Sequence, residues 1–566
     1  MNKHKVVSMD SPAATSSHEL PVHSGSDSAP EHASEKSHHQ LSPPTLDRPD
    51  TSIEVDDESQ YPATLRLSLI LLALFMTTFL GIVATAIPSI TNEFHAIDEI
   101  GWYGGAYFLT IGVFSSFWGK LYKYYDAKWV FLVAAAIFCI GSLVAAVAPN
   151  STALIVGRAV AGWGGAGIVN GSYIITHHIA RPEKRPAFTG LIGAVFIFSS
   201  ILGPIVGGAF TYEVTWRWCF YINLPVGGVA MILVFFLVRL PKHAGPEDAT
   251  LREVILQLDF PGIIVMLASL ICLTLALQWG GTSRSWSNGS VVACLVVWVL
   301  LTIGFVGIQI YQGDRAMIPP RIFSQRTVWV SCVYVFLING PNFLVIYYLP
   351  IYFQAVKGNN AIQSGVNILP AVCLFAFGCL FAGWLIGKVG HWQPFLTMGA
   401  LLSVAGTALI YELEVDSSMA WYLGSQVLFG FGAGSSSQVP MIAIQAFSKP
   451  QDLTSATGVV LFFQLINGGY FISAGQAIFS NQLLHALPTY APDVDPALVL
   501  STGAGDITNV FAGEALGGVL SSYMVGLKNA FALGLAAAAL CVPISMLAPR
   551  KKLPSDGGKK GPVMAA

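Results

Sequence analysis

One charge in this sequence lies where charges are rare. Arg158 lies about a third of the way along an apolar run near 152–173, and it is the only charge well inside any such run. A charge in hydrocarbon costs roughly 2.5 kcal/mol or more, so Arg158 should face a partner or a wet cavity. It shares a helical face with Gly165, which indicates a close neighbouring helix. It either binds an anionic substrate group or tunes a proton relay, or it is a structural ion pair or a snorkelling side chain.

A second set of polar side chains could hold a small molecule. Amide groups within apolar runs need hydrogen-bond partners, and either a bound molecule or a neighbouring helix can supply them. An aromatic wall would suit a bulky apolar compound. The candidates for such a substrate cavity are Tyr107, Asn339, Asn342, Gln438, Gln464 and Asn467.

Several other kinds of chemistry are absent from the sequence. The eight cysteines lie in or beside apolar runs without CxxC spacing, which favours packing over disulfides or metal sites. No GxxxxGK[ST] phosphate loop occurs. With 54% hydrophobic residues, 11% charged residues and a net charge of -2, the composition is typical of a membrane protein and gives no reason to expect nucleic-acid binding. We expect no catalytic activity, cofactor or metal.

Fourteen apolar runs are long enough to cross a bilayer as helices, which predicts an all-α polytopic membrane protein. They lie near 67–88, 102–122, 129–148, 152–173, 187–209, 219–239, 259–279, 290–311, 328–353, 364–387, 395–412, 420–444, 455–479 and 524–547.

The fifth run has one face nearly bare of side chains. Gly190, Gly193, Ser200, Gly203 and Gly207 fall within about 140° of one another on a helix. Such a face lets another helix pack backbone to backbone. Pro204 removes a backbone donor there, so we expect a bend and a hinge, formed by Gly193, Gly203, Pro204, Gly207 and Gly208. Ordinary membrane packing is the alternative.

The loops predict the orientation. If the N-terminal tail is cytoplasmic, the inner loops carry fourteen Lys and Arg residues and the outer loops carry three, Arg217, Arg284 and Lys357. Both termini should therefore be cytoplasmic. Residues 1–62 have eleven acids, four Lys or Arg and few apolar residues, so we expect a disordered tail.

An internal repeat predicts the domain boundaries. The second run ends in Gly119-Lys120 and the tenth in Gly387-Lys388. If these match, runs seven and eight are an insert between two six-helix halves, as in secondary transporters. The segments are a tail (1–62), a first half (63–240), a two-helix linker (241–312), a second half (313–548) and a short tail (549–566).

The loop after the second run can act as a gate. Lys120, Lys123, Asp126 and Lys128 can pair with helix ends and hold the inner face in one conformation, and Gly119 permits a tight turn. The alternative is a basic loop that only fixes the topology.

Together these motifs resemble the major facilitator superfamily, in its fourteen-span drug:proton antiporter branch, and most of all its fungal toxin and multidrug exporters. The similar segments are 119–128, Arg158 with Gly162, Gly164 and Gly165, the antiporter motif 203–208, the segment 216–225 and the segment 347–354. The resemblance covers about residues 65–550. It implies efflux of small organic molecules by alternating access, driven by protons.

One position departs from that family. The acid that usually precedes the proline of the first span by nine residues is replaced by Phe79, before Pro88. The proton must then use a carboxylate near a span end, a histidine or the substrate. Alternatives to export are vacuolar import of basic amino acids and a non-transporting receptor or sensor on the same scaffold.

We expect a monomer in the plasma membrane, with the vacuolar membrane as the alternative. Two sequons lie in outer loops, at Asn288 and Asn150, and the second is close to the bilayer.

Overall fold

The fold is helical throughout the described part of the chain, which in this computed structural model comprises residues 90, 93–94, 100–238, 249–502 and 504–553. Residues 58–566 belong to one compact unit. Residues 1–57, the first apolar run near 67–88 and Phe79 lie outside the described residues.

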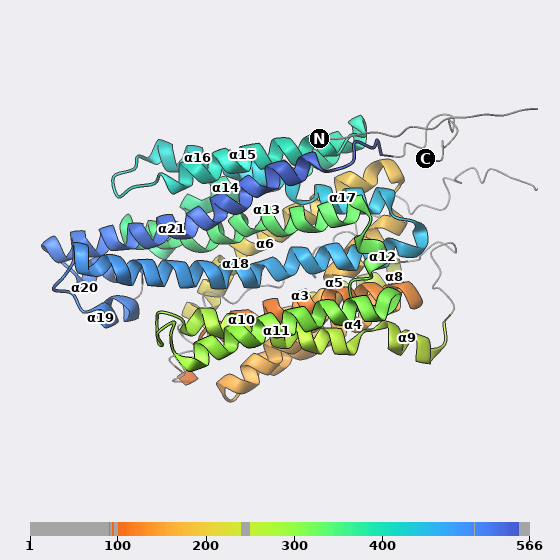
Figure 1. The fold of residues 1–566 in the computed structure, drawn as a ribbon, viewed down its shortest axis with the longest axis horizontal. Coiled ribbons are helices and arrows are strands. Elements are labelled where there is room, and N and C mark those ends of the chain that lie inside the picture. The colour runs from red at the N-terminus through yellow and green to blue at the C-terminus, as the bar shows by residue number, and fades with distance from the viewer. Residues whose placement is uncertain (1–89, 91–92, 95–99, 239–248, 503, 554–566) are drawn as a thin grey trace, which may run out of the picture. The chain divides into compact units, whose positions relative to one another are not determined.

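The long helices follow the apolar runs. They are α3 (Ile100–Tyr124), α4 (Ala127–Ala146), α5 (Ser151–Ile179), α6 (Arg185–Glu213), α8 (Asn223–Leu237), α10 (Phe260–Trp279), α11 (Gly289–Gln312), α13 (Arg326–Ile351), α14 (Ala361–Val389), α15 (Gln393–Tyr411), α16 (Met419–Ser437), α17 (Val439–Phe447), α18 (Leu453–Tyr490) and α21 (Gly513–Met546). Short helices α7 (Trp218–Tyr221), α9 (Leu251–Gln257), α12 (Pro320–Phe323), α19 (Pro496–Ser501) and α20 (Ile507–Val510) join them (Figure 1).

Eleven segments of the described chain are long and apolar enough to span a membrane. The runs near 102–122 and 187–209 lie in α3 and α6, which have 25 and 29 residues but are not among the eleven. The all-helical multi-span prediction is thus confirmed, whereas the count of fourteen remains a prediction.

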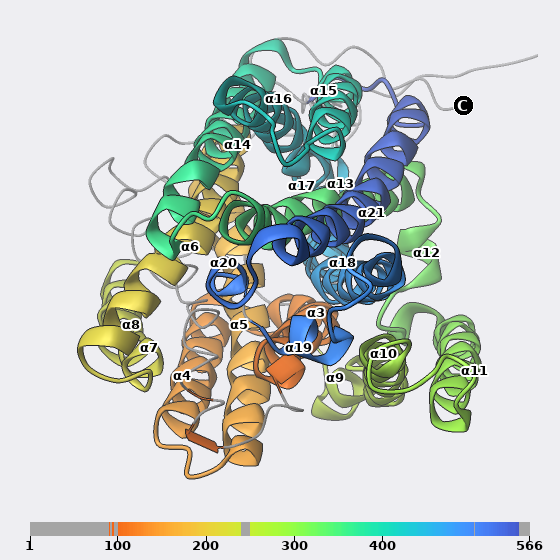
Figure 2. The same ribbon diagram turned by 90° about the vertical axis from the view of Figure 1, so that its left-hand side faces the viewer.

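The helices before and after the linker make matching contacts. In the first half, α3 to α8, helix α5 packs on α3 and α4. In the second half, α13 to α21, helix α16 packs on α14 and α15. Figure 2 looks along the helices: α3, α4 and α5 lie on one side of α6 and α18, and α14, α15 and α16 lie on the other. The correspondence pairs α3 with α14, the helices that carry the Gly119 and Gly387 motifs. The division into two six-helix halves stays a prediction.

Two helix pairs make most of the contact between the halves, α3 with α18 and α6 with α14. A Cβ atom at Gly119 would lie 2.9 Å from the Cα of Gly458, closer than such atoms approach. A Cβ atom at Gly190 would lie 2.3 Å from the carbonyl oxygen of Cys379, and one at Gly383 2.4 Å from that of Pro186. The small residues therefore let the backbones touch across both interfaces.

These contacts lie toward one end of the bundle, which we call the basic end because Lys120, Arg185 and Lys388 lie there. The prediction of a turn at Gly119 is wrong, because α3 continues to Tyr124. Glycine is needed there because it has no side chain between α3 and α18.

The linker helices α10 and α11 lie beside the seam between α3 and α18, where α10 contacts both. Lys120, only 2% exposed, donates to the carbonyl oxygens of Gln257, Arg315 and Ala316 at 2.6, 2.6 and 2.5 Å. It thus satisfies carbonyls at the ends of α9 and of the short turn Gly313–Arg315.

Asp259 holds the linker helices together from within. Its side chain is buried, and it accepts hydrogen bonds from the backbone N–H of Gly262 and Met317 at 2.9 and 2.6 Å. The amides of Gln309 and Gln312 donate to it at 2.9 and 2.6 Å. Four donors account for a buried carboxylate without a catalytic role.

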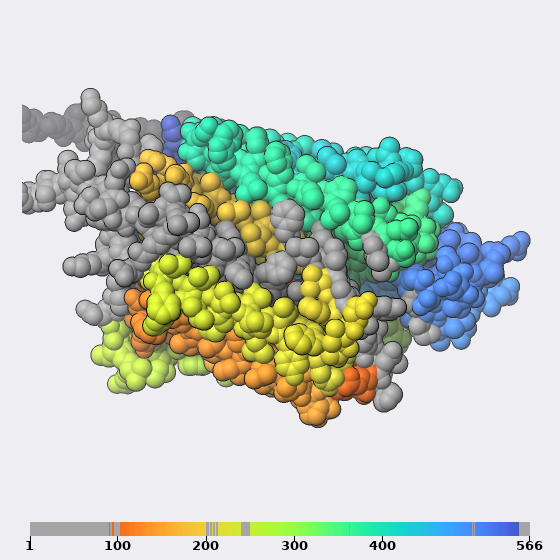
Figure 3. Space-filling view, turned by 180° about the vertical axis from the view of Figure 1, so that it is seen from behind, coloured from red at the N-terminus to blue at the C-terminus, as the bar shows by residue number. Residues whose placement is uncertain are grey.

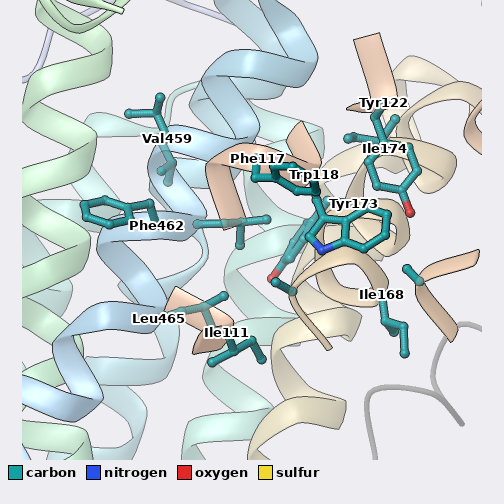
Figure 4. Close-up of a cluster of buried hydrophobic side chains, with 14 of the residues drawn as sticks. Ile111, Phe117, Trp118, Tyr122, Ile168, Tyr173, Ile174, Val459, Phe462 and Leu465 are labelled. Carbon is teal, nitrogen blue, oxygen red and sulfur yellow. The ribbon is translucent and has the colours of Figure 1, made fainter. Parts of the chain in front are cut away.

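The apolar core runs between the halves near the basic end. Figure 4 shows side chains of α3, α5 and α18 in one cluster, including Trp118, Tyr173 and Phe462. Figure 3 shows the molecule from behind, where α8 (yellow) and α14 (green) both reach the surface. Most of α11 is also exposed, as expected of a helix that faces lipid.

At the other end α18 and α21 extend beyond the predicted runs. α18 has 38 residues, about 57 Å at about 1.5 Å per residue, against a hydrocarbon core of about 30 Å. Its last turns, with α19, α20 and the start of α21, form a projecting segment (Figure 1). Val499 and Ile507 are fully buried in it, so the segment is packed rather than a loose loop.

Replacing Gly119 with leucine should force α3 and α18 apart. Overpacking of this kind costs about 1–3 kcal/mol, so we expect a lower thermal unfolding midpoint for the detergent-solubilised protein. Gly307→Leu on α11 is the matched control, because no atom lies within 4 Å of a Cβ there. Equal midpoints for the two variants would contradict the close packing of α3 on α18.

Candidate functional site

A cavity lies between the two halves, about midway along the helices. It is lined from α5 and α6 in the first half and from α13, α14, α18 and the α16–α17 junction in the second. Four of the six predicted cavity residues line it, namely Asn339, Asn342, Gln438 and Gln464. Phe343, Phe375, Phe196 and aliphatic side chains complete the wall.

Proline and a helix break place the amides there. Gln438 lies between α16 and α17, and Pro440 follows it in the first turn of α17. Proline has no N–H to continue the hydrogen-bond ladder, so the span is interrupted at this depth. Pro341 likewise lies inside α13 between Asn339 and Asn342. Discontinuous helices are typical of the substrate sites of secondary transporters.

The cavity is narrow in this conformation. Its volume is about 30 Å³. One water needs about 10–15 Å³ of such space, so the cavity has room for about two or three waters. Sites for drug-sized molecules have about 300–1,000 Å³, so the halves must separate before such a molecule could enter.

Tyr173 joins the halves at the cavity. Its hydroxyl donates to Oε1 of Gln438 at 2.9 Å. A Cβ atom at Gly193 on α6 would lie 2.4 Å from Cγ of Gln438, so the glycine makes room for that side chain. The buried Oε1 of Gln464 accepts no hydrogen bond from the described residues. An unpaired buried acceptor at a cavity wall is available to a bound molecule.

Further polar contacts cross the interface toward the basic end. Thr189 Oγ1 donates to Gln445 Oε1 at 2.9 Å, and Gln445 Nε2 donates to the carbonyl of Tyr173 at 3.4 Å. With the glycine contacts of α3 and α6, they close the basic side of the cavity.

Two predicted cavity residues lie elsewhere. Asn467 is buried and donates to the carbonyl of Val335 at 3.3 Å, so it joins α18 to α13. Tyr107 lies under Arg158, with the guanidinium carbon 4.7 Å from its ring centroid. Neither lines the cavity.

Arg158 packs against α3. It is 6% exposed, and its Nε donates to the carbonyl of Tyr103 at 2.9 Å. Its guanidinium carbon also lies 5.9 Å from the centroid of the Phe220 ring. A Cβ atom at Gly165 would lie 2.9 Å from the Tyr107 hydroxyl, so both residues of the predicted face point at α3. No carboxylate within the described residues pairs with Arg158.

The residues of the predicted gating loop have separate roles. Asp126 caps α4, accepting from the backbone N–H of Lys128 and Trp129. The ammonium of Lys128 lies over Phe235, and that of Lys123 lies over Tyr124. Lys120 donates to carbonyl oxygens of Gln257, Arg315 and Ala316, so it connects α3 to the linker and to the residues that follow it.

The predicted hinge lies within one continuous helix, because α6 runs unbroken from Arg185 to Glu213. Gly203 and Gly207 are buried, and the carbonyl of Gly207 accepts from Cys219 Sγ at 3.6 Å. The packing around Pro204 and Gly208 is outside the described part of the structure.

The 216–225 segment is anchored at the end opposite the basic end. Trp216 Nε1 and Arg217 Nη1 donate to Glu93 at 2.7 and 3.0 Å. Burial alone would raise the pKa of Glu93, but these hydrogen bonds and the arginine charge outweigh it and lower that pKa.

Both sequon asparagines are exposed helix caps. Asn288 accepts from the backbone N–H of Ser290 at the start of α11. Asn150 accepts from that of Ala153 at the start of α5.

The sequence analysis missed Tyr173, Thr189 and Gln445. Tyr173 and Thr189 lie within apolar runs and Gln445 lies one residue beyond one, so they nearly meet the criterion that selected the asparagines and the other glutamines. The sequence does not show which residues they bond to, because each of these hydrogen bonds joins residues 256 to 272 positions apart.

Comparison with known proteins gives close relatives. Efflux pump notK of Aspergillus sp. (strain MF297-2) is 50% identical over 503 residues, 88% of this chain and 89% of that protein. A protein named dehydrocurvularin exporter, from Alternaria cinerariae, is 49% identical over 508 residues, 89% of this chain and 87% of that protein.

Solved structures show the same fold at low identity. The human organic anion transporter MFSD10 matches with a TM-score of 0.56 and 14% identity, covering 86% of this chain and all of that one. The sequence model of the Major Facilitator Superfamily matches residues 69–473. This chain belongs to the major facilitator superfamily.

Proposed function

We propose that this multi-pass membrane protein exports small organic compounds, of the secondary-metabolite or toxin class, by alternating access. The observation that carries the proposal is the cavity between the halves, walled by amides and aromatic rings and closed on one side by contacts that cross the interface. Two close relatives are named as an efflux pump and an exporter, which favours export over amino acid import or sensing.

Alternating access requires contacts that can form and break as a set. Tyr173 with Gln438 and Thr189 with Gln445 are hydrogen bonds between neutral groups, each worth about 0.5–1.5 kcal/mol net. Breaking these two bonds therefore adds little to the free-energy cost of opening the basic end, which suits a conformational cycle.

The basic end is the cytoplasmic one in this proposal, because the Lys and Arg excess lies there. The conformation with its basic end closed then holds the substrate away from the cytoplasm. The protein lies in the plasma membrane as a monomer with fourteen spans and both termini inside.

The topology can be tested with tags and a glycan. Epitope tags at either end should be stained only after the cells are permeabilised. Treatment with a glycosidase should lower the apparent mass of the wild-type protein but not that of Asn288→Gln. Asn529→Gln, at an asparagine outside any sequon, should behave as wild type. Surface staining of an N-terminal tag in intact cells would reverse the proposed orientation.

Proton antiport is the proposed source of energy. The first span has Phe79 where the family has an acid, and Asp259 is occupied by four hydrogen-bond donors. Asp98 and Glu99, outside the described residues, lie before the second span on the outer side in this orientation and are our first choice as carriers.

Export from energised vesicles should therefore need a pH difference. Collapsing it should lower the initial rate at least tenfold, and Asp98→Asn or Glu99→Gln should remove the dependence. Asp259→Asn serves as the control, which should lower thermal stability while export stays gradient-dependent. Export that continues unchanged after both pH difference and membrane potential are collapsed would rule out antiport.

Arg158→Ala should abolish export with little loss of protein from the membrane. The guanidinium holds the start of α3 through Tyr103 and stacks on Tyr107. Arg158→Lys keeps the charge but lacks the planar guanidinium group, so it should restore only part of the rate. The measurement is efflux normalised to surface protein. A wild-type rate for Arg158→Ala would show that the arginine is dispensable for transport.

A further inference from the structure

Among the described residues that line the central cavity there is no carboxylate and no cationic side chain. Its polar lining consists of Asn339, Asn342, Gln438, Gln464 and the phenol of Tyr173, and the remaining residues are apolar or glycine. We propose that the cavity selects uncharged molecules that carry both hydrogen-bond donors and acceptors, and that it excludes organic cations and anions. This inference rests on the proposed export function and names its substrate class.

The charged residues nearest to the cavity along the chain are not part of its wall. Arg185 is seven residues from Ile192 on α6, about 10 Å at about 1.5 Å per residue. Arg158 is fifteen residues from Tyr173 on the same helix, about 22 Å at about 1.5 Å per residue. Lys120 donates to three carbonyl oxygens, one in the linker and two just after it. His177, one turn beyond Tyr173, does not line the cavity.

The composition of the first apolar run and of three helices at the cavity agrees with this. The first apolar run, 67–88, contains no Asp, Glu, Lys, Arg or His. Helices α6, α13 and α14 carry their Asp, Glu, Lys and Arg only near their ends, at Arg185, Glu213, Arg326 and Lys388. A first-span helix packed at the cavity would bring no charge with it.

A charged ligand would lose its hydration without gaining a counter-charge. Transfer of an unpaired ion into a low-dielectric site is far more costly than transfer of a neutral polar group that finds hydrogen bonds. The same cavity suits neutral groups, because each amide offers both a donor and an acceptor. Oε1 of Gln464 is buried and accepts no bond from a described residue, so a ligand hydroxyl or N–H can donate to it.

The aromatic and aliphatic wall sets the rest of the ligand's chemistry. Phe196, Phe343 and Phe375 face the amides together with Ile192, Leu461 and Leu465. Such a wall favours a mostly apolar skeleton with a few hydroxyl, carbonyl or amide groups. A compact, rigid skeleton of this kind also limits the loss of entropy on binding.

A matched series of fluorescent probes tests the inference. The probes are 4-methylcoumarins with a hydroxyethyl, an aminoethyl or a carboxymethyl tail, which are neutral, cationic and anionic at pH 7. Purified protein should bind the hydroxyethyl probe at least tenfold more tightly than either charged probe. Cells that express the protein should export it with the same preference.

Introducing a carboxyl group should change the preference. Gln464→Glu should lower binding of the neutral probe and raise binding of the aminoethyl probe at least tenfold, more so at pH 8 than at pH 6, because the carboxyl must ionise to attract a cation. Gln464→Leu should lose the neutral probe without gaining the cation. Asn529→Asp, the same chemical change on α21 away from the cavity, should behave as wild type.

The outcomes separate the two proposals. Equal binding of neutral and cationic probes by the wild-type protein, or a Gln464→Glu variant whose preference is unchanged, would overturn the charge selectivity. Selective binding of the neutral probe without export would leave the selectivity standing and overturn the transport function. Failure of the folded protein to bind any of the three probes would count against both.

Discussion

The structure depends on backbone contact between its two halves. At Gly119 with Gly458, and at Gly190 and Gly383 with their neighbours, a single methyl group would collide with the facing helix. Close packing of this kind is short-ranged and therefore has two distinct states, touching or apart. The neutral hydrogen bonds of Tyr173 and Thr189 lie on the same side of the cavity and add directional contacts to the closed state.

The linker helices are attached to both α3 and α18, one from each half. They are held at the basic end by Lys120 on α3, and at the other end Asn481 on α18 donates to the carbonyl of Gly280 at 3.0 Å. One attachment belongs to each half. Any movement between α3 and α18 must therefore be absorbed within α10 and α11 or at one of these attachments.

The sequence predicted the helices well and the site in part. Apolar runs predicted the spans, and amides in those runs predicted four of the cavity residues. Gln464 and Asn467 are three residues apart and equally polar, yet one lines the cavity and the other bonds Val335, because the position of α13 decides between them. Gly119 was assigned a turn because glycine serves both turns and close packing, and only the neighbour, Gly458, distinguishes the two. The packed segment after α18 could not be foreseen, since nothing local shows that Val499 and Ile507 find a core.

The central claim is that the basic end opens and closes around an uncharged cavity. The most direct measurement is the distance distribution between spin labels at Tyr125→Cys and Gln451→Cys, exposed positions at the basic end of each half, in a background without accessible native cysteines. The account predicts two populations, a short distance as in this structure and a longer one, whose ratio changes when a neutral substrate or a pH gradient is supplied. A single short distance under all of these conditions, in protein that still exports, would contradict it.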